Sequence, residues 1–347
     1  MEPEHLHSPP LFFRTLRQTF IIRSAELGSN RSGRLALRAS EDCLSGRDAA
    51  KLKEVGNAHP GSEVRLASVD DPASLDHALS GAVAVINCAG PFIDTARPVI
   101  DAALRASIHY LDVAAEQAPV LAVFERFASA ARDAGVVVIP AMAFYGGLGD
   151  FLATAAMGEW HAADEICIAI ALDSWRPTRG TRLTGQRNPG RHFIFSNNRL
   201  ERADPPPARK WNFPPPFGEQ DMVGLSLAES ITIPRHLQTP EVRVYINLAS
   251  ITDIRDPNTP APTAADESGR SSQIFVMEAT ARRGDAERRA IVRGRDIYAI
   301  TASIVVEAIH RVVNGLAKRT GVVAASEAFA AQDFLMSLSP SHLSFEM

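Results

Sequence analysis

Residues 82–116 read AVAVINCAGPFIDTARPVIDAALRASIHYLDVAAE, and this stretch decides the fold. Residues 82–87 are almost wholly apolar, which is typical of a strand that is buried on both faces. Residues 95–106 carry apolar side chains at helical spacing, and residues 109–113 form a second short apolar run. The pattern predicts a strand, a helix and a second strand, joined by a crossover that makes the two strands parallel.

The same alternation continues on both sides of this stretch. Residues 64–69 predict a strand, and Asp71 and Pro72 then suit the cap and first turn of a helix. Residues 117–134 predict a longer amphipathic helix, and residues 136–139 predict another buried strand. Strands and helices that alternate roughly every 20–30 residues predict an α/β fold with a Rossmann-like, doubly wound parallel sheet.

The pattern changes after residue 150. The sequence predicts a helix at 151–157, a final amphipathic helix at 296–316, and strands at 165–172, 242–248 and 273–281. Six prolines between Pro205 and Pro216 predict an irregular loop. We expect a Rossmann-like domain over residues 1–150, an α+β domain for substrate binding or dimerisation over 151–293, and C-terminal helices over 294–347 that pack back on the first domain.

Composition narrows the class of protein. The 347 residues are 46% hydrophobic and 22% charged, which predicts a globular, water-soluble protein. The first 150 residues hold 14 basic and 18 acidic side chains, a balance that does not favour a nucleic-acid partner. We expect no transmembrane segment and no metal site. Three scattered cysteines, Cys43, Cys88 and Cys167, favour a reducing cytoplasm.

The first candidate binding motif is SGRDAAKL at residues 45–52. In a dinucleotide-binding fold the end of the second strand faces the adenosine ribose, where an acid favours NAD and an arginine can pair with the extra phosphate of NADP. Gly46 would allow a close approach of the backbone, and Arg47 would supply the charge. The alternative is a plain strand-to-helix turn with a solvated arginine.

Three further motifs follow the predicted strands. NCAGPF at residues 87–92 has small residues that leave room for a ligand at the sheet edge, although Gly90 could serve only a tight turn. YLDVAAE at 110–116 offers Asp112 and Glu116 as orienting or acid–base groups, or as structural acids. AMAFYGGLGD at 141–150 offers Tyr145 as a proton donor beside Gly147, or a hinge with a packed aromatic ring.

Taken together, these motifs resemble the saccharopine dehydrogenase-like NAD(P)-binding family, in the branch with the trans-acting enoyl reductases. The matching segments are SGRDAAKL, VINCAGPF, HYLDVAAE and GVVVIPAMAFYGGLGDFLA, with GRDIYAITASIVVEA and KRTGVVAASEAF near the C-terminus. The resemblance implies hydride transfer from a nicotinamide cofactor, NADP or NAD. It implies cofactor contacts at Arg47, Asp70, Asn87, Cys88, Ala89, Gly90, Pro91 and Phe92. Gly46 and Gly147 are further candidates for cofactor contact, because glycine lets the backbone come close to a ligand.

The N-terminus departs from the family pattern. The family begins with a strand and a glycine-rich turn that holds the pyrophosphate, whereas residues 28–34 read GSNRSGR and place Arg31 near the middle glycine. Two hypotheses follow. One is an NADP-preferring oxidoreductase that acts on a carbonyl, imine or activated C=C bond of a small molecule, with Tyr145, Asp112 and Glu116 as candidate catalytic residues. The other is a non-catalytic descendant that binds a partner or forms a homodimer.

Overall fold

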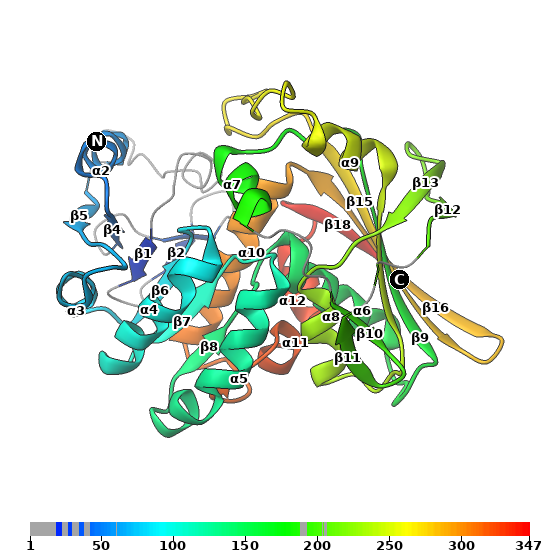
Figure 1. The fold of residues 1–347 in the computed structure, drawn as a ribbon, viewed down its shortest axis with the longest axis horizontal. Coiled ribbons are helices and arrows are strands. Elements are labelled where there is room, and N and C mark those ends of the chain that lie inside the picture. The colour runs from blue at the N-terminus through cyan, green and yellow to red at the C-terminus, as the bar shows by residue number, and fades with distance from the viewer. Residues whose placement is uncertain are drawn as a thin grey trace.

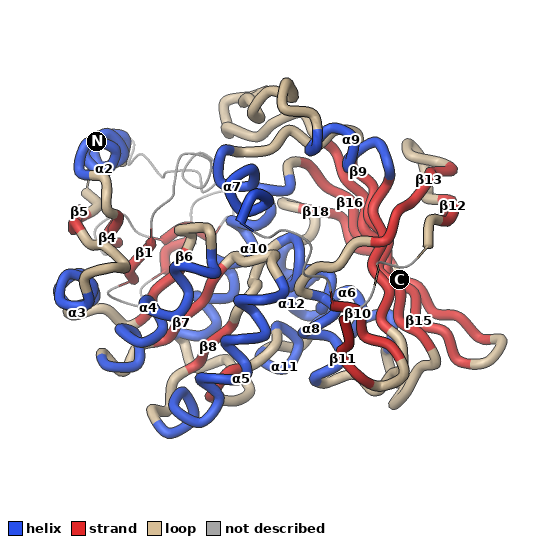
Figure 2. The backbone as a smooth tube through the Cα atoms, in the orientation of Figure 1, coloured by secondary structure: helices blue, strands red, loops and turns tan. Residues whose placement is uncertain are grey.

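The described residues form two large β-sheets with helices between and around them, and a small two-stranded sheet (Figure 1). The computed structural model describes residues 19–22, 27–29, 35–37, 42–59, 61–187, 193–202, 204 and 207–347. In the tube view, α10 (Ile297–Val313) and α12 (Ala331–Leu338) lie between the two large sheets, with the seven-stranded sheet on the left and the nine-stranded sheet on the right (Figure 2). This arrangement confirms the expected α/β fold with a Rossmann-like domain and a second domain.

The first sheet has seven strands in the order β17-β8-β7-β6-β1-β4-β5. Its strands are β1 (Thr19–Ile22), β4 (Asp42–Gly46), β5 (Glu63–Leu66), β6 (Ala84–Asn87), β7 (His109–Asp112), β8 (Val137–Ile139) and β17 (Gly321–Val322). Parallel pairs join β4 to β5, β6 to β7, β7 to β8 and β8 to β17. The exception is β1, which is antiparallel to both β4 and β6.

Helices cover both faces of this sheet. Successive side chains of a strand point to opposite faces, and in β6, β7 and β8 apolar side chains lie on both faces. On one face Val85, Tyr110 and Val138 pack with α3, α4 and α5, whereas on the other Ile86, Leu111 and Ile139 share a core with α10. Asp71 caps α3 as predicted, since its carboxylate accepts from the amides of Ala73 and Ser74. The helices are α2 (Ala49–Ala58), α3 (Pro72–Leu79), α4 (Phe92–Arg105), α5 (Gln117–Asp133) and α10 (Ile297–Val313).

The second sheet runs in the order β11-β10-β14-β9-β15-β16-β18, and β13 joins β14 to β12. Its strands are β9 (Glu165–Leu172), β10 (Phe193–Ser196), β11 (Arg199–Arg202), β12 (Arg209–Asn212), β13 (Glu219–Gly224), β14 (Val242–Asn247), β15 (Ile274–Arg283), β16 (Ala286–Arg295) and β18 (Leu343–Glu346). Only β9 and β14 pair in parallel among the strand pairs described in this sheet. The C-terminal region gives one strand to each sheet, β17 to the first and β18 to the second.

The remaining elements are short. They are the hairpin strands β2 (Leu27–Ser29) and β3 (Leu35–Leu37), the turn η1 (Phe144–Leu148), η2 (Ile233–Arg235), and the helices α6 (Gly149–Met157), α7 (Arg179–Arg187), α8 (Glu229–Thr232), α9 (Leu248–Arg255), α11 (Ala325–Ala328) and α12 (Ala331–Leu338). None of the helices in the described part of the chain has the length and apolarity that a membrane span requires.

One prediction for the second domain is wrong in part. The proline-rich stretch 205–216 is not a loop throughout, because its proline-free centre forms β12 and pairs with β13. Backbone amides are available there, since the prolines flank β12 without entering it. The indole of Trp211 on β12 lies near the aromatic ring of Phe213, with 6.2 Å between ring centroids. Both pack on a cluster that includes Tyr245 of β14, and this cluster helps to hold the hairpin on the sheet.

Candidate functional site

A cavity of about 650 Å³ runs along the carboxyl ends of β4, β6 and β7 and continues beneath the second domain. Its volume lies within the range of roughly 300–1,000 Å³ that is usual for ligand pockets. We call it the crevice. At one end it is lined by residues that follow β4, and at the other by η1, α7 and the start of α10. In doubly wound sheets ligands bind at this edge, beyond the carboxyl ends of the parallel strands.

The structure brings about half of the sequence-predicted site residues to this crevice. The residues that line it are Gly46, Arg47, Cys88, Gly90, Phe92, Glu116 and Tyr145. The predicted residues that do not line it are Asp70, Asn87, Ala89, Pro91, Asp112 and Gly147. Asp70 lies on an exposed turn before α3, whereas Asn87, Asp112 and Gly147 are buried behind the crevice wall.

The direction of β1 does not suit a phosphate-binding turn directly after it. Ile22, the last residue of β1, pairs with Asp42 and Ala84 at the starts of β4 and β6. The chain therefore leaves β1 at the edge opposite the crevice. The candidate turn GSNRSGR begins with Gly28 and Ser29 inside β2, while its residues 30–34 lie outside the described residues. A parallel pairing of β1 with β4 would need a crossover between them, usually a helix, whereas the described part of that interval holds the strands β2 and β3.

Basic side chains gather at the β4 end of the crevice. Arg47 is exposed, lines the crevice, and forms no ion pair with any described residue. Lys51 lies one helical turn further on and pairs with Asp48 at 3.4 Å. Asp48 also caps α2, since its carboxylate accepts from the amide of Lys51 at 3.1 Å. This end of the crevice therefore carries a cation that remains available to an anionic group.

The turn after β6 is held by a buried asparagine. The side-chain amide of Asn87 donates to the hydroxyls of Thr95 (3.3 Å) and Tyr110 (3.2 Å), and its oxygen accepts from the amide of Ala89 at 3.0 Å. This fixes Gly90 at the crevice wall, where a Cβ would stand 3.5 Å from the hydroxyl oxygen of Thr184 on α7. The crevice is consequently narrow here, and a longer side chain at residue 90 would fill it.

The two predicted acids have different surroundings. Asp112 is buried and its carboxylate accepts from the amides of Ala114 (3.0 Å) and Ala141 (2.8 Å) and from the Tyr110 hydroxyl (2.9 Å). Burial raises the pKa of Asp112 to about 6, against the effect of these hydrogen bonds. Glu116 instead lines the crevice, accepts from the amides of Phe92 and Ala115, and has a pKa raised by burial. Asp112 thus ties together the loops after β7 and β8, while Glu116 faces the ligand side.

Tyr145 and Trp175 supply unpartnered donors at the inner end of the crevice. The Tyr145 side chain is 8% exposed and that of Trp175 is 7%, and their rings lie 5.5 Å apart between centroids. The Tyr145 hydroxyl and the Trp175 indole nitrogen are buried without a hydrogen-bond partner among the described residues. Burial raises the pKa of Tyr145, so the phenol stays protonated at neutral pH. A buried donor without a partner costs about 1–3 kcal/mol, which an acceptor atom of a ligand would recover.

A group of hydroxyls from the second domain completes the wall. Thr181 shares hydrogen bonds with Thr178 and with Tyr298, both at 3.0 Å, and Thr178 also accepts from the Thr181 amide at the start of α7. Sequence reasoning missed these residues and Trp175. Trp175, Thr178 and Thr181 come from a segment without a recognised motif, and Tyr298 lies in the matching segment GRDIYAITASIVVEA, to which no site residue was assigned. Their proximity to Tyr145 exists only in the folded chain.

A buried carboxyl also lies directly behind Tyr145. Glu229 is fully buried, and its Oε1 accepts from the amide of Gly146 at 2.7 Å, whereas Oε2 has no partner among the described residues. Burial raises the pKa of Glu229 to about 7. Nearby, burial alone would raise the pKa of Asp150, but its contact with His236 at 2.9 Å lowers it. No sequence motif marks Glu229, so only the tertiary structure places it behind Tyr145.

Titration of Glu229 is expected to make stability depend on pH. The unfolded carboxyl releases its proton near its ordinary value of 4.5, while the folded one keeps it up to about 7. The contribution of Glu229 to the free energy of unfolding should therefore fall by about 3 kcal/mol as pH rises from 4.5 to 7, and this contribution should stay level on either side. In Glu229→Gln this contribution should vanish. Urea unfolding of the original chain and of Glu229→Gln, each at pH 5 and pH 8, measures this contribution. The stability difference between the two proteins should change by about 3 kcal/mol between the two pH values.

The exposed substitution Glu125→Gln is the control, since Glu125 lies on the surface of α5. It should leave the pH profile of the original chain intact. Other buried acids such as Asp112 contribute equally to all three proteins and cancel in the comparison. If the original chain and Glu229→Gln differed in stability by the same amount at both pH values, the raised pKa of Glu229 would be wrong.

Comparison with known proteins supports a dinucleotide-binding domain. Residues 37–139, less than a third of the chain, match the family model of the saccharopine dehydrogenase NADP binding domain. A search of curated proteins by sequence gives no match. The fold is similar to that of apo saccharopine dehydrogenase (L-Glu forming) from Saccharomyces cerevisiae, with a TM-score of 0.60 and 11% identity over 88% of this chain and 93% of that one. At this identity the likeness shows a shared fold.

Two further solved structures are similar at lower scores. They are an amine dehydrogenase from Mycobacterium smegmatis (TM-score 0.41, 14% identity, 81% of this chain and 86% of that chain) and the C. glutamicum DAP dehydrogenase in complex with DAP (TM-score 0.41, 13% identity, 85% of this chain and 94% of that chain).

Proposed function

We propose that the protein is an NADP-preferring oxidoreductase that transfers hydride to a carbonyl, imine or activated C=C bond of a small molecule. The observation that carries this proposal is the crevice itself. It joins Arg47 at one end to the hydroxyl of Tyr145 at the other, neither of which has an ion-pair or hydrogen-bond partner in the described part of the chain, along the edge of the sheet where ligands bind in such folds. A dinucleotide with a reactive ring at one end and a phosphate at the other needs such a site.

The two ends of the crevice fit the cofactor. Arg47 and Lys51 would hold the phosphate on the adenosine ribose. Gly90 would let the nicotinamide half of the cofactor come close to the backbone of the turn after β6. The middle fits less well, because the turn after β1 leaves the sheet at the far edge and gives the pyrophosphate no glycine-rich support among the described residues. When bound, the reduced nicotinamide supplies the hydride.

The residues of the chain would bind and protonate the substrate. Tyr145, held protonated by burial, would donate a proton to the atom that gains negative charge. The Trp175 indole N–H would donate a hydrogen bond to a second acceptor atom of the same molecule. Two donors side by side favour a substrate with two neighbouring acceptor oxygens, such as an unsaturated carboxylic acid or ester, whose C=C bond is activated in the way that the enoyl reductase resemblance suggests. Glu116 would orient the substrate or the ring from the opposite wall.

Substitution of Arg47 should change the choice of cofactor. In Arg47→Ala we expect the Kd for NADPH to rise about tenfold or more, since a charge-assisted contact to phosphate is lost, while the Kd for NADH stays nearly unchanged. Fluorescence titration with each cofactor measures both. Lys53→Ala is the matched control, because Lys53 is exposed on α2 but does not line the crevice. Equal losses for NADPH and NADH in Arg47→Ala would contradict the assigned contact.

A second candidate function rests on the direction of β1. A chain that lost the phosphate turn could keep this fold as a binding or dimerising module without catalysis. The antiparallel pairing of β1 with β4 and β6 favours this alternative. The two functions differ in one measurable respect, because only the oxidoreductase binds a nicotinamide cofactor in the crevice.

A further inference from the structure

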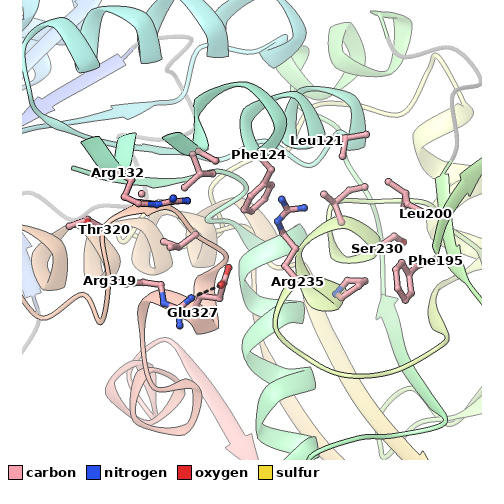
Figure 3. Close-up of a pocket in the computed structure, with 16 residues that line it drawn as sticks. Leu121, Phe124, Arg132, Phe195, Leu200, Ser230, Arg235, Arg319, Thr320 and Glu327 are labelled. Atoms are coloured by element: carbon pink, nitrogen blue, oxygen red, sulfur yellow. Dashed lines mark hydrogen bonds and ion pairs between the residues drawn. The ribbon is translucent and has the colours of Figure 1, made fainter. Parts of the chain in front are cut away.

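A second cavity of about 640 Å³ lies at the other end of the first sheet (Figure 3). It is enclosed by α5, the β10–β11 hairpin, the segment from α8 to η2, and the edge strand β17 with α11. We call it the edge cavity. It shares no lining residue with the crevice, and β17 is the outermost strand on this side of the sheet. Its volume suits a small molecule.

Positive charge dominates the wall of the edge cavity. Arg132, Arg235 and Arg319 line it together with one carboxylate, that of Glu327. Arg319 and Glu327 pair at 3.1 Å, and the other oxygen of Glu327 accepts from the amide of Ala324 at 3.0 Å. Both oxygens of Glu327 are therefore engaged in direct contacts, although its charge and that of Glu125 also act on Arg235 through space. Within the described ranges neither Arg132 nor Arg235 forms an ion pair, so neither guanidinium has a carboxylate in direct contact.

Arg235 is held in an unusual position for a solvent-facing arginine. Its guanidinium lies over the ring of Phe124, 3.7 Å from the centroid, at the centre of the cavity in Figure 3. Partial burial of the guanidinium lowers the pKa of Arg235, while the residue as a whole stays exposed and open to a ligand. A carboxylate in direct contact with this guanidinium would add a charge-assisted hydrogen bond that no described side chain supplies.

The rest of the wall is apolar, with one outward-facing backbone donor. Apolar side chains enclose the cavity between the cations: Leu121, Phe124, Phe195, Leu200, Ile231 and Val323. Gly321 and Val323 donate their amides to Val136 and Val138 of the neighbouring chain segment. Because amides alternate in direction along a strand, the Val322 N–H faces away from β8, toward the open side of the edge strand.

We infer that the edge cavity binds a small organic acid with an apolar body. Arg132 and Arg235 hold the carboxylate, the Val322 amide adds a neutral donor, and the apolar body packs on Phe124 and Ile231. Arginine suits this task because its planar group binds carboxylates through two parallel hydrogen bonds and stacks on aromatic rings. This site is separate from the crevice, so the inference stands whether or not the crevice binds NADP.

Calorimetric titration of the full-length chain tests the inference with three probes. They are 2-naphthoate, its uncharged counterpart 2-naphthamide, and inorganic phosphate, which has charge without an apolar body. We expect 2-naphthoate to bind about tenfold or more tightly than either of the others, since it alone satisfies both parts of the wall. The double variant Arg132→Gln/Arg235→Gln should lose that advantage. Equal binding of naphthoate and naphthamide would overturn the inference.

Two control variants locate the binding. Arg126→Gln removes an exposed arginine on α5 that lies outside the edge cavity, and Arg47→Ala removes the cation of the crevice. Neither should change naphthoate binding. If Arg47→Ala or saturating NADPH abolished it, the ligand would occupy the crevice and the inference would be wrong. Should the double variant fail to fold, the exposed single substitution Arg132→Gln tests the same contact, with a weaker but definite loss of affinity expected.

Discussion

Replacement of Tyr145 by phenylalanine is expected to lower the turnover number by roughly 10²- to 10⁴-fold, the usual contribution of a positioned proton donor. The hydroxyl is buried at the crevice wall and has no hydrogen-bond partner among the described residues. Its removal therefore breaks no structural contact, and the free energy of unfolding should stay unchanged or rise slightly. A large loss of activity without a loss of stability is characteristic of a catalytic hydroxyl. The assay is NADPH oxidation with a carbonyl, imine or unsaturated carbonyl substrate chosen by screening.

The matched control for this substitution is Tyr245→Phe. Tyr245 is also a buried tyrosine, but it lies on β14 in the second sheet and does not line the crevice. Its loss should leave the turnover number nearly unchanged. Cofactor affinity should be the same in both variants, because neither hydroxyl is assigned to the dinucleotide. A Tyr145→Phe enzyme with full turnover would remove Tyr145 from the proposed mechanism.

Gly146→Ala is expected to destabilise the fold by about 3 kcal/mol, through backbone strain and overpacking together. Gly146 has a φ of +96°, which side-chain-bearing residues rarely adopt. A Cβ there would stand 2.7 Å from both the Cβ and the carbonyl oxygen of Ala141. The same residue donates its amide to the buried Glu229, so a shifted backbone would also leave that carboxyl unpaired. Urea unfolding measures the loss.

Gly135→Ala separates strain from steric overlap. Gly135 also has a positive φ, +68°, but a Cβ at that position would meet no atom within 4 Å. Only the backbone cost remains there, and we expect a loss of about 1 kcal/mol. Equal losses in the two variants would mean that the turn around Tyr145 is not tightly packed, contrary to the structure.

The first domain was largely predictable from the sequence because each of its elements carries its own local signal. The apolar run of β6 and the capping pair Asp71 and Pro72 predict elements that the structure contains nearly at the predicted bounds. The ten-residue strand β16 was not predicted, because most of its residues are polar or charged. Its outward-facing residues are charged, and only alternate positions such as Ala290 and Val292 are buried. The direction of β1 could not be predicted, because strand pairing depends on contacts between distant segments.

The site was predictable only where it follows the strands of the first sheet. Arg47, Gly90, Glu116 and Tyr145 were singled out by their positions at strand ends, and all four line the crevice. Asp112 was singled out by the same signal, yet its carboxylate is occupied by amides and a phenol behind the wall. The opposite wall comes from residues more than 25 positions further along the chain, such as Trp175, and no local pattern relates them to the strand ends.

The central claim is that the crevice binds NADPH with its nicotinamide ring beside Tyr145 and Trp175. Energy transfer from tryptophan to the bound nicotinamide tests this most directly, because Trp175 lines the crevice. Titration of the full-length chain with NADPH, under tryptophan excitation, should give saturable nicotinamide emission with a Kd on the order of micromolar. A chain shown to be folded that gave no sensitised emission and no heat of binding with either NADPH or NADH would contradict the oxidoreductase proposal and favour the non-catalytic alternative.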